Sequence, residues 1–223
     1  MPNRKISEAI GITQEVIHSI KTQDLEALVL KLDLSKDRDR VNWDCLRLIM
    51  LQIGIPYDIV KWVMSCVTTA NYVVLVNGSP TGFFRAKRGL RQGCPMSPLL
   101  FLLLIEGLSR MLRAAKLNGC IAGVSFSSTL ALTHILFVDD IILFGKCDYV
   151  EWLQLSKIFK TLCAASDMVI NLAKSNFLIH KADDRILQRI LDLFPVPHNL
   201  IDGGLKYLGY RLKPNCYGIM DWH

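Results

Sequence analysis

The chain has 223 residues, of which 51% are apolar, and its 26 Lys and Arg residues exceed its 20 Asp and Glu residues to give a net charge of +6. A chain of this length and apolar content can bury a large core, which excludes an intrinsically disordered protein. The modest positive charge suits a polyanionic partner such as nucleic acid without demonstrating one.

The cysteines and the apolar runs indicate the compartment. Seven cysteines are scattered along the chain and never spaced as Cys-x-x-Cys, which argues against a disulfide framework or a zinc site and favours a reducing compartment. The amino terminus lacks the apolar stretch of a signal peptide, and the longest apolar run, residues 99–105, is too short to cross a membrane. We therefore expect an intracellular protein, in the nucleus or the cytoplasm, that does not contact a membrane.

Apolar periodicity predicts the elements of the first half of the chain. Residues 5–22 fit one amphipathic helix or two short ones, and residues 27–34 form a dense apolar run that predicts a buried strand. Helices over 43–53 and 57–67 are separated by Gly54 and Pro56, which predicts a helix hairpin. Runs at 72–76 and 82–86 flank Asn77-Gly78-Ser79-Pro80, which predicts a β-hairpin.

The second half begins with a long helix over 97–117, for which Ser97 and Pro98 provide the cap and first turn. Residues 130–144 predict two strands that meet at Asp139-Asp140. The remaining predicted elements are helices at 149–165 and 184–194 and strands at 176–179 and 207–212. This alternation with hairpins predicts an α+β fold, with a mostly antiparallel sheet covered by helices on one face.

Two adjacent carboxylates, Asp139 and Asp140, lie where ordinary turn chemistry favours Asn-Gly. A divalent cation would compensate their mutual repulsion, because Mg²⁺ prefers hard oxygen ligands. Asp33 lies near the end of the other strongly apolar run. If the two strands are neighbours, Asp33 and Asp139 can share two cations about 3.5–4 Å apart, an arrangement that catalyses phosphoryl transfer. A solvated Asp-Asp turn is the alternative for this segment taken alone.

The segment 85–98 is basic and contains turn glycines, and it leads into the long predicted helix. Gly89 and Gly93 permit a close approach of a backbone, and the cations can neutralise phosphates. Taken alone, the segment also fits a solvated charged loop with ordinary turn glycines.

Five motifs, in this order, resemble those of non-LTR retrotransposon reverse transcriptases, especially plant copies. They are Lys31-Leu-Asp-Leu-Ser-Lys36, Gly89-Leu-Arg-Gln-Gly-Cys-Pro-Met-Ser-Pro98, Phe137-Val-Asp-Asp140, Asn171-Leu-Ala-Lys-Ser175 and Leu205-Lys-Tyr-Leu-Gly209. The resemblance implies a right-hand polymerase whose palm is a ferredoxin-like sheet. It also implies RNA-directed DNA synthesis from dNTPs on an RNA template with a DNA primer, using two Mg²⁺ ions or Mn²⁺ in their place. Residues 1–26 are then a helical remnant of the fingers, 27–213 the palm with fingers-derived helices, and 214–223 a truncated tail, with the thumb missing.

The same resemblance implies the roles of individual residues. Asp33, Asp139 and Asp140 are the catalytic metal ligands, of which Asp33 and Asp139 are the principal ones. Lys174 corresponds to the general acid that protonates pyrophosphate, a role that suits a mobile ammonium group. The residues expected to bind the substrate are Arg38, Arg91, Gln92, Gly93 and, through its carbonyl, Leu34. The primer grip is expected at Tyr207, Leu208 and Gly209.

The sequence departs from the family at three residues. Relatives carry Ala and then Tyr or Phe where this chain has Asp37 and Arg38, and that aromatic ring packs under the sugar and rejects a 2′-hydroxyl. Arg38 should pack poorly there, and Asp37 adds negative charge near the metals, so we expect impaired nucleotide selection or no activity. Asp167 replaces a glycine, and aspartate tolerates a positive φ at some cost.

Two alternatives to an active polymerase stay open. One is a catalytically silent fragment of a mobile element that at most binds nucleic acid, which Asp37, Arg38 and Asp167 favour. The other is a metal-dependent phosphodiesterase, which needs only the carboxylates and leaves residues 91–93 unexplained.

Overall fold

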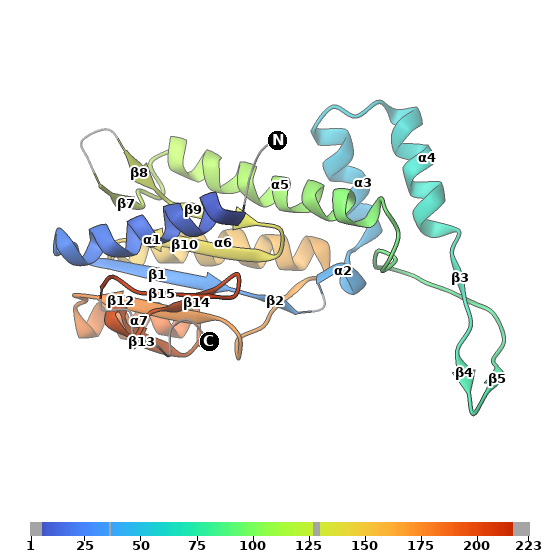
Figure 1. Cartoon of the computed structure of the whole chain (residues 1–223). Coiled ribbons are helices and arrows are strands. Elements are labelled where there is room, and N and C mark those ends of the chain that lie inside the picture. The colour runs from blue at the N-terminus through green and yellow to red at the C-terminus, as the bar shows by residue number, and fades with distance from the viewer. Residues whose placement is uncertain (1–5, 36, 127–129, 216–223) are drawn as a thin grey trace. The chain divides into compact units, whose positions relative to one another are not determined.

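The computed structural model describes residues 6–35, 37–126 and 130–215, and the chain divides into two compact units (Figure 1). The first unit contains residues 1–35, 109–160 and 170–223, and the second contains residues 36–108 and 161–169. Two helices, α5 (Ser97–Leu117) and α6 (Tyr149–Ser166), have residues in both units. In the described part of the chain, no helix is both long enough and apolar enough to span a membrane.

The first unit is built on a five-stranded sheet with the strand order β13-β12-β1-β10-β9. Only the pairing of β12 with β13 is parallel, and the other three pairings are antiparallel. The strands are β1 (Ala27–Leu32), β9 (His134–Phe137), β10 (Asp140–Gly145), β12 (Asn176–His180) and β13 (His198–Leu200). The central strand β1 and its neighbour β10 are almost entirely apolar because both faces of the sheet are covered.

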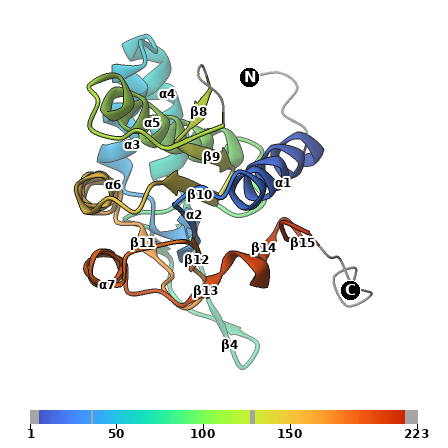
Figure 2. The same cartoon turned by 90° about the vertical axis from the view of Figure 1, so that its left-hand side faces the viewer.

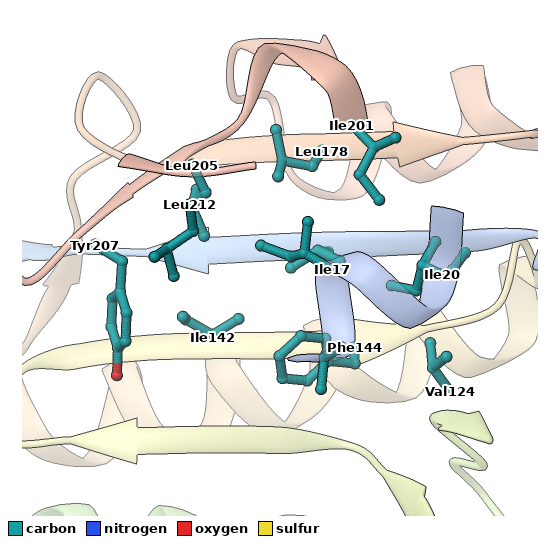
Figure 3. Close-up of a cluster of buried hydrophobic side chains, with 13 residues drawn as sticks. Ile17, Ile20, Val124, Ile142, Phe144, Leu178, Ile201, Leu205, Tyr207 and Leu212 are labelled. Carbon is teal, nitrogen blue, oxygen red and sulfur yellow. The ribbon is translucent and has the colours of Figure 1, made fainter. Parts of the chain in front are cut away.

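One face of this sheet is covered by helix α1 (Ile6–Thr22) and by the hairpin of β14 (Leu205–Tyr207) and β15 (Tyr210–Leu212), as Figure 2 shows. Figure 3 shows the apolar cluster that they bury on β1 and β10, which includes Ile17, Ile142 and Phe144. The opposite face is covered by α6 and α7 (Asp184–Leu193) (Figure 2). There, Trp152 of α6 makes an edge contact with Phe177 of β12 at 5.0 Å between ring centroids.

The second unit contains a helix hairpin and an exposed β-hairpin. Its elements are α2 (Asp37–Arg40), α3 (Trp43–Gln52), α4 (Tyr57–Thr68), β3 (Asn71–Tyr72), β4 (Leu75–Val76), β5 (Ser79–Pro80), β6 (Phe84–Arg85) and the start of α5. Helix α3 begins after Asn42, whose side chain accepts hydrogen bonds from the N–H groups of Asp44 and Cys45. The turn between β4 and β5 is Asn77-Gly78, and both residues have positive φ, as a type I′ turn requires.

The structure confirms the predicted α+β class and most of the predicted elements, and it corrects several details. The strand expected over 27–34 is interrupted at Asp33, so that β1 ends at Leu32 and β2 (Leu34–Ser35) is separate. The strand expected over 207–212 is the hairpin β14–β15. Helices cover both faces of the sheet, because α1 packs opposite α6 and α7. Short elements that were not predicted are α2, β7 (Val124–Ser125), β11 (Val169–Ile170), β13 and the 3₁₀-helix η1 (Ile201–Gly203), and the stretch predicted as two strands over 130–144 also contains the short strand β8 (Ala131–Leu132).

Candidate active site

The carboxylates lie at one end of the neighbouring strands β1 and β10. In the antiparallel pairing of β1 with β10, the last pair is Leu32 and Ile141. Asp33 follows Leu32 and Asp140 precedes Ile141, so both adjoin the same end of this pairing. The two carboxylate-bearing strands are therefore neighbours, whereas the role of the carboxylates as metal ligands stays a prediction.

The turn that carries the Asp pair differs from the expected one. Asp140 is the first residue of β10 and is paired with Phe137, so that the two-residue turn is Val138-Asp139 rather than Asp139-Asp140. Val138 has a φ of +56°, which is unusual for a β-branched residue. The consequence is that the two carboxylates differ: Asp139 is exposed in the turn, and Asp140 is half-buried at the start of the strand.

The backbone of Asp33 is fixed by the turn that follows β11. The N–H of Asp33 donates to Ser175 Oγ at 3.1 Å, and the carbonyl of Asp33 accepts from the N–H of Asn171 at 2.8 Å. Ser175 Oγ in turn donates to the carbonyl of Asn171 at 2.8 Å, which closes the turn. Lys174 is an exposed residue of this turn, so the predicted general acid lies on a segment bonded directly to a predicted metal ligand.

Lys31 connects Asp140 to the β14–β15 hairpin. Its ammonium group lies 3.1 Å from Asp140 Oδ1 and donates to the carbonyl of Lys206 at 3.1 Å. The side chains of Lys31 and Asp140 are only 16% and 21% exposed, and a pair shielded to this degree is screened less than a surface ion pair. Lys31 therefore neutralises Asp140 and holds the hairpin against the end of the sheet.

Tyr207 brings a buried hydroxyl group to the same region. Its side chain is fully buried, and its hydroxyl has no hydrogen-bond partner within the described residues. Burial raises the pKa of Tyr207 well above its usual value, and the negative charge of Asp140 raises it further. Figure 3 shows the ring beside Ile142, with the hydroxyl directed away from the β14–β15 hairpin. The hydroxyl is therefore a neutral, unused donor near Asp140.

The predicted primer grip is a tight turn. Leu208 and Gly209 join β14 to β15, and their φ angles are +49° and +86°. Two consecutive positive φ angles identify a type I′ turn, which glycine adopts freely and leucine adopts at a cost. Tyr207 is anchored in the core, whereas Gly209 is exposed at the tip.

Four of the residues predicted to bind the substrate belong to the second unit, and Leu34 belongs to the first. Gln92 Nε2 donates to Asp39 Oδ1 at 3.1 Å, and Arg91 donates to the carbonyl of Cys66 at 3.2 Å. Gly93 has a φ of +79°, and a Cβ atom built there would meet no atom within 4 Å. The structure thus assigns Gln92 a carboxylate partner, Asp39, that was not predicted.

Arg38 contacts other residues of the second unit through its side chain and its backbone, whereas its packing against a nucleotide stays a prediction. Its guanidinium carbon lies 5.9 Å from the centroid of the buried Phe101 ring, at the outer limit of a cation–π contact. Its carbonyl accepts from the N–H of Leu90 at 2.7 Å. Gly89 approaches the chain here so closely that a Cβ would lie 2.5 Å from the carbonyl oxygen of Asp39, so only glycine fits. The side chain of Asp37 lies outside the described part of the structure.

Asp167 has a φ of +58°. A positive φ was expected here because relatives carry glycine at this position. Its carboxylate accepts from Asn42 Nδ2 at 3.0 Å, and Asn42 is the N-cap of α3. Aspartate at this position therefore supports a helix cap that a glycine could not contact.

Sequence reasoning missed Lys31, Asp39 and the carbonyl of Lys206. Lys31 did carry a signal, because it is the only charged residue in the apolar run of β1. The other two contacts depend on tertiary structure. In the described part of the chain, no three His, Cys, Asp or Glu side chains converge as they would around a metal ion.

Comparison with known proteins places the chain in a family. Residues 1–212 match the family of the reverse transcriptase (RNA-dependent DNA polymerase). The chain belongs to the reverse transcriptase family. Among curated relatives, it is 26% identical to the Pol polyprotein of the type-1 retrotransposable element R2 of Popillia japonica, covering 92% of this chain and 35% of that protein. It is 27% identical to an uncharacterized 149 kDa protein of transposon TX1 of Xenopus laevis, covering 98% and 16%. The expected resemblance to non-LTR retrotransposon reverse transcriptases is thereby confirmed.

A shorter relative and two solved structures extend this result. A stretch covering 30% of the chain is 43% identical to an uncharacterized mitochondrial protein of Arabidopsis thaliana, of which it covers 55%. Telomerase from Candida tropicalis in complex with a TWJ fragment of telomeric RNA has a TM-score of 0.61 at 14% identity, covering 95% of this chain and 32% of that one. Apo telomerase from the same organism, truncated from its C-terminal domain, has a TM-score of 0.57 at 18% identity, covering 82% and 36%. The chain thus has the fold of a reverse transcriptase and spans 16–55% of the length of these curated relatives.

Proposed function

We propose that this chain is the palm of an RNA-directed DNA polymerase, which adds dNTPs to the 3′-hydroxyl of a DNA primer annealed to an RNA template. The observation that carries the proposal is the antiparallel pairing of β1 with β10, whose last pair is Leu32 and Ile141. Asp33 and Asp140 adjoin this pair at the same end of the sheet, and Asp139 lies in the turn before β10. Family membership supports the reaction, because the matched family is that of reverse transcriptases.

The donor groups suit a hard divalent cation, because all three side chains are carboxylates and Mg²⁺ prefers oxygen ligands. Asp140 is already paired with Lys31, so we assign two Mg²⁺ or Mn²⁺ ions mainly to Asp33 and Asp139, with Asp140 beside them. Mg²⁺ in such sites is commonly held by one or two carboxylates together with substrate phosphates. When bound, the cations would activate the primer hydroxyl and stabilise the charge on the leaving pyrophosphate.

The remaining residues would bind and orient the reactants. Lys174 would donate a proton to the leaving pyrophosphate, since its exposed ammonium group lies in the turn bonded to Asp33. In this assignment Gln92 and Gly93 form the floor beneath the incoming nucleotide, where the open space at Gly93 leaves room for a sugar. The turn at Leu208 and Gly209, in which Gly209 is exposed, would contact the primer.

A second candidate function is favoured by two contacts. Lys31 competes with a cation for Asp140, and Arg38 occupies the position of the aromatic residue of relatives while contacting Phe101. Both would weaken catalysis and leave nucleic-acid binding intact. The second candidate is therefore a catalytically silent fragment that binds a primed template without extending it.

Primer extension separates these functions. We would measure incorporation of dNTPs on a primed RNA template in Mg²⁺ by the chain, by Asp139→Ala, and by Asp192→Ala, which removes an exposed carboxylate of α7. The polymerase proposal predicts extension by the chain and by Asp192→Ala, and none by Asp139→Ala. Extension that survives Asp139→Ala would refute the assignment of the carboxylates, and binding of the primed template without extension by the unmodified chain would support the silent fragment.

A further inference from the structure

A cavity of about 480 Å³ lies within the second unit, between helices α3 and α4 and the segment that follows β6. It is lined by Asn42, Trp43, Asp44, Arg47, Tyr57, Val60, Lys61, Met64, Thr68, Lys87, Arg88 and Asp167. This volume falls in the range of about 300–1,000 Å³ that small-ligand sites occupy. All of its lining residues belong to one unit, so the cavity does not depend on how the units are arranged.

The charge around this cavity is predominantly positive. Four cations, Arg47, Lys61, Lys87 and Arg88, face two carboxylates, Asp44 and Asp167. All four cations are exposed, and their side chains form no ion pair or hydrogen bond with any residue that the structure describes.

One of the two carboxylates is already engaged. Asp167 accepts a hydrogen bond from Asn42 at 3.0 Å and is only half exposed to solvent. The four cations outnumber the two carboxylates, so their mutual repulsion is only partly compensated, and an anionic ligand would relieve it further.

Two aromatic rings line the same cavity. The indole N–H of Trp43 donates to the carbonyl of Gly89 at 2.8 Å, which holds that ring in place. Tyr57 begins helix α4 and is 59% exposed. Cations that neutralise phosphates, combined with aromatic rings on which bases stack, are the two elements with which proteins bind single-stranded nucleic acid.

We infer that this cavity binds an unpaired strand of nucleic acid, with backbone phosphates at Arg47, Lys61, Lys87 and Arg88 and a base against Tyr57 or Trp43. An unpaired strand is required because the bases of a duplex are already stacked and cannot reach the rings. The inference deepens the proposed function, since an enzyme that copies RNA must hold an unpaired template, but binding can be measured without catalysis.

The test is a binding titration of a labelled, unstructured oligouridine, followed by fluorescence anisotropy at several salt concentrations. The double variant Lys61→Ala, Arg88→Ala should bind about tenfold more weakly at low salt. The slope of log affinity against log salt should become shallower by about 1.4, because each phosphate contact on a single strand contributes about 0.7. A matched variant, Lys160→Ala, Arg185→Ala, removes the same charges from exposed positions on α6 and α7 and should bind as the unmodified chain does.

A second variant tests the aromatic contact without changing the charge. Tyr57→Ala should weaken binding at least about fivefold with an unchanged salt slope, and Tyr57→Phe should restore it, because stacking needs the ring and not the hydroxyl. Circular dichroism melting of each variant shows whether it is folded. Oligodeoxyuridine of equal length then distinguishes an RNA strand from a DNA strand as the preferred ligand.

The inference would be overturned if the double variant Lys61→Ala, Arg88→Ala and its matched control lost affinity equally. It would also be overturned if neither that double variant nor Tyr57→Ala changed the affinity. UMP and unlabelled oligouridine can also be compared as competitors of the labelled oligouridine. If both displaced it at the same concentration, the result would contradict a strand-binding site. Asp139→Ala should bind RNA normally while losing primer extension, so a failure of the polymerase proposal and a failure of this site give different results.

Discussion

The ammonium group of Lys31 lies 3.1 Å from Asp140 Oδ1, at the end of the sheet where Asp33 and Asp139 also lie. Lys31 therefore occupies a position beside Asp140 that a divalent cation would otherwise favour. This contact makes Asp140 different from the other two carboxylates. In the proposed metal site, Asp33 and Asp139 are therefore the main ligands, and Asp140 lies beside them.

Replacing Lys31 by Met should strengthen binding of Mn²⁺ by about tenfold, because a unit charge about 4 Å away contributes about 1–4 kcal/mol of repulsion in this environment. Lys31→Arg keeps the charge and should bind Mn²⁺ as the unmodified chain does. Electron paramagnetic resonance of free Mn²⁺ during a titration measures both affinities. Weaker binding by Lys31→Met would mean that Lys31 positions Asp140 for the metal rather than competing with it.

Tyr207→Phe should raise the free energy of unfolding by about 1 kcal/mol, because a buried hydroxyl without a partner costs about 1–3 kcal/mol. The hydroxyl is such a group in the described part of the chain, and phenylalanine fills the same space. Urea unfolding measures the change. A loss of stability above about 1 kcal/mol would show that the hydroxyl has a hydrogen-bond partner, such as a buried water molecule.

The strands that carry the predicted ligands could be predicted from the sequence, because each predicted ligand ends or adjoins a strongly apolar run. The strands β1 and β10 are recognisable without any tertiary information, and so is their polar end. The turns were harder to predict. Val138 and Leu208 have positive φ angles, which runs against the preference of both residue types, so the turn Val138-Asp139 and the hairpin β14–β15 were not recognised.

The contacts of Lys31 and the basic cavity were beyond sequence reasoning for a different reason. Lys31 meets Asp140 only because β1 pairs with β10 in one particular register, and a shift of one residue would direct it to the other face. The cavity brings helices α3 and α4 together with Lys87-Arg88. In the sequence, the exposed β-hairpin lies between these helices and the two basic residues. Long-range pairings of this kind leave no local periodicity.

Asp167→Ala should lower the free energy of unfolding by about 1–2 kcal/mol, since alanine tolerates the positive φ less well and cannot bond to Asn42. Asp167→Asn keeps both properties and should change stability by less than about 0.5 kcal/mol. Urea unfolding of the two variants provides the comparison. Equal stability of both variants would mean that the contact with Asn42 contributes nothing to the cap of α3.

The double substitution Asp37→Ala, Arg38→Tyr restores the residues of relatives and should improve discrimination of dNTPs against rNTPs. A ring that excludes a 2′-hydroxyl group can change selectivity by about 10- to 100-fold, the usual effect of one altered contact in a substrate pocket. The ratio of kcat/KM for dTTP and UTP on the same primed template measures it. Equal ratios for the unmodified chain and the double variant would show that Arg38 does not impair nucleotide selection.

The most direct test of the account is a Mn²⁺ titration of the unmodified chain, Asp33→Asn and Asp139→Asn, with Asp192→Asn as the matched control on α7. We predict that each of the first two substitutions weakens the tightest Mn²⁺ site by at least about tenfold, while Asp192→Asn leaves it unchanged. Mn²⁺ binding that is the same in all four proteins would contradict a shared metal site at the ends of β1 and β10.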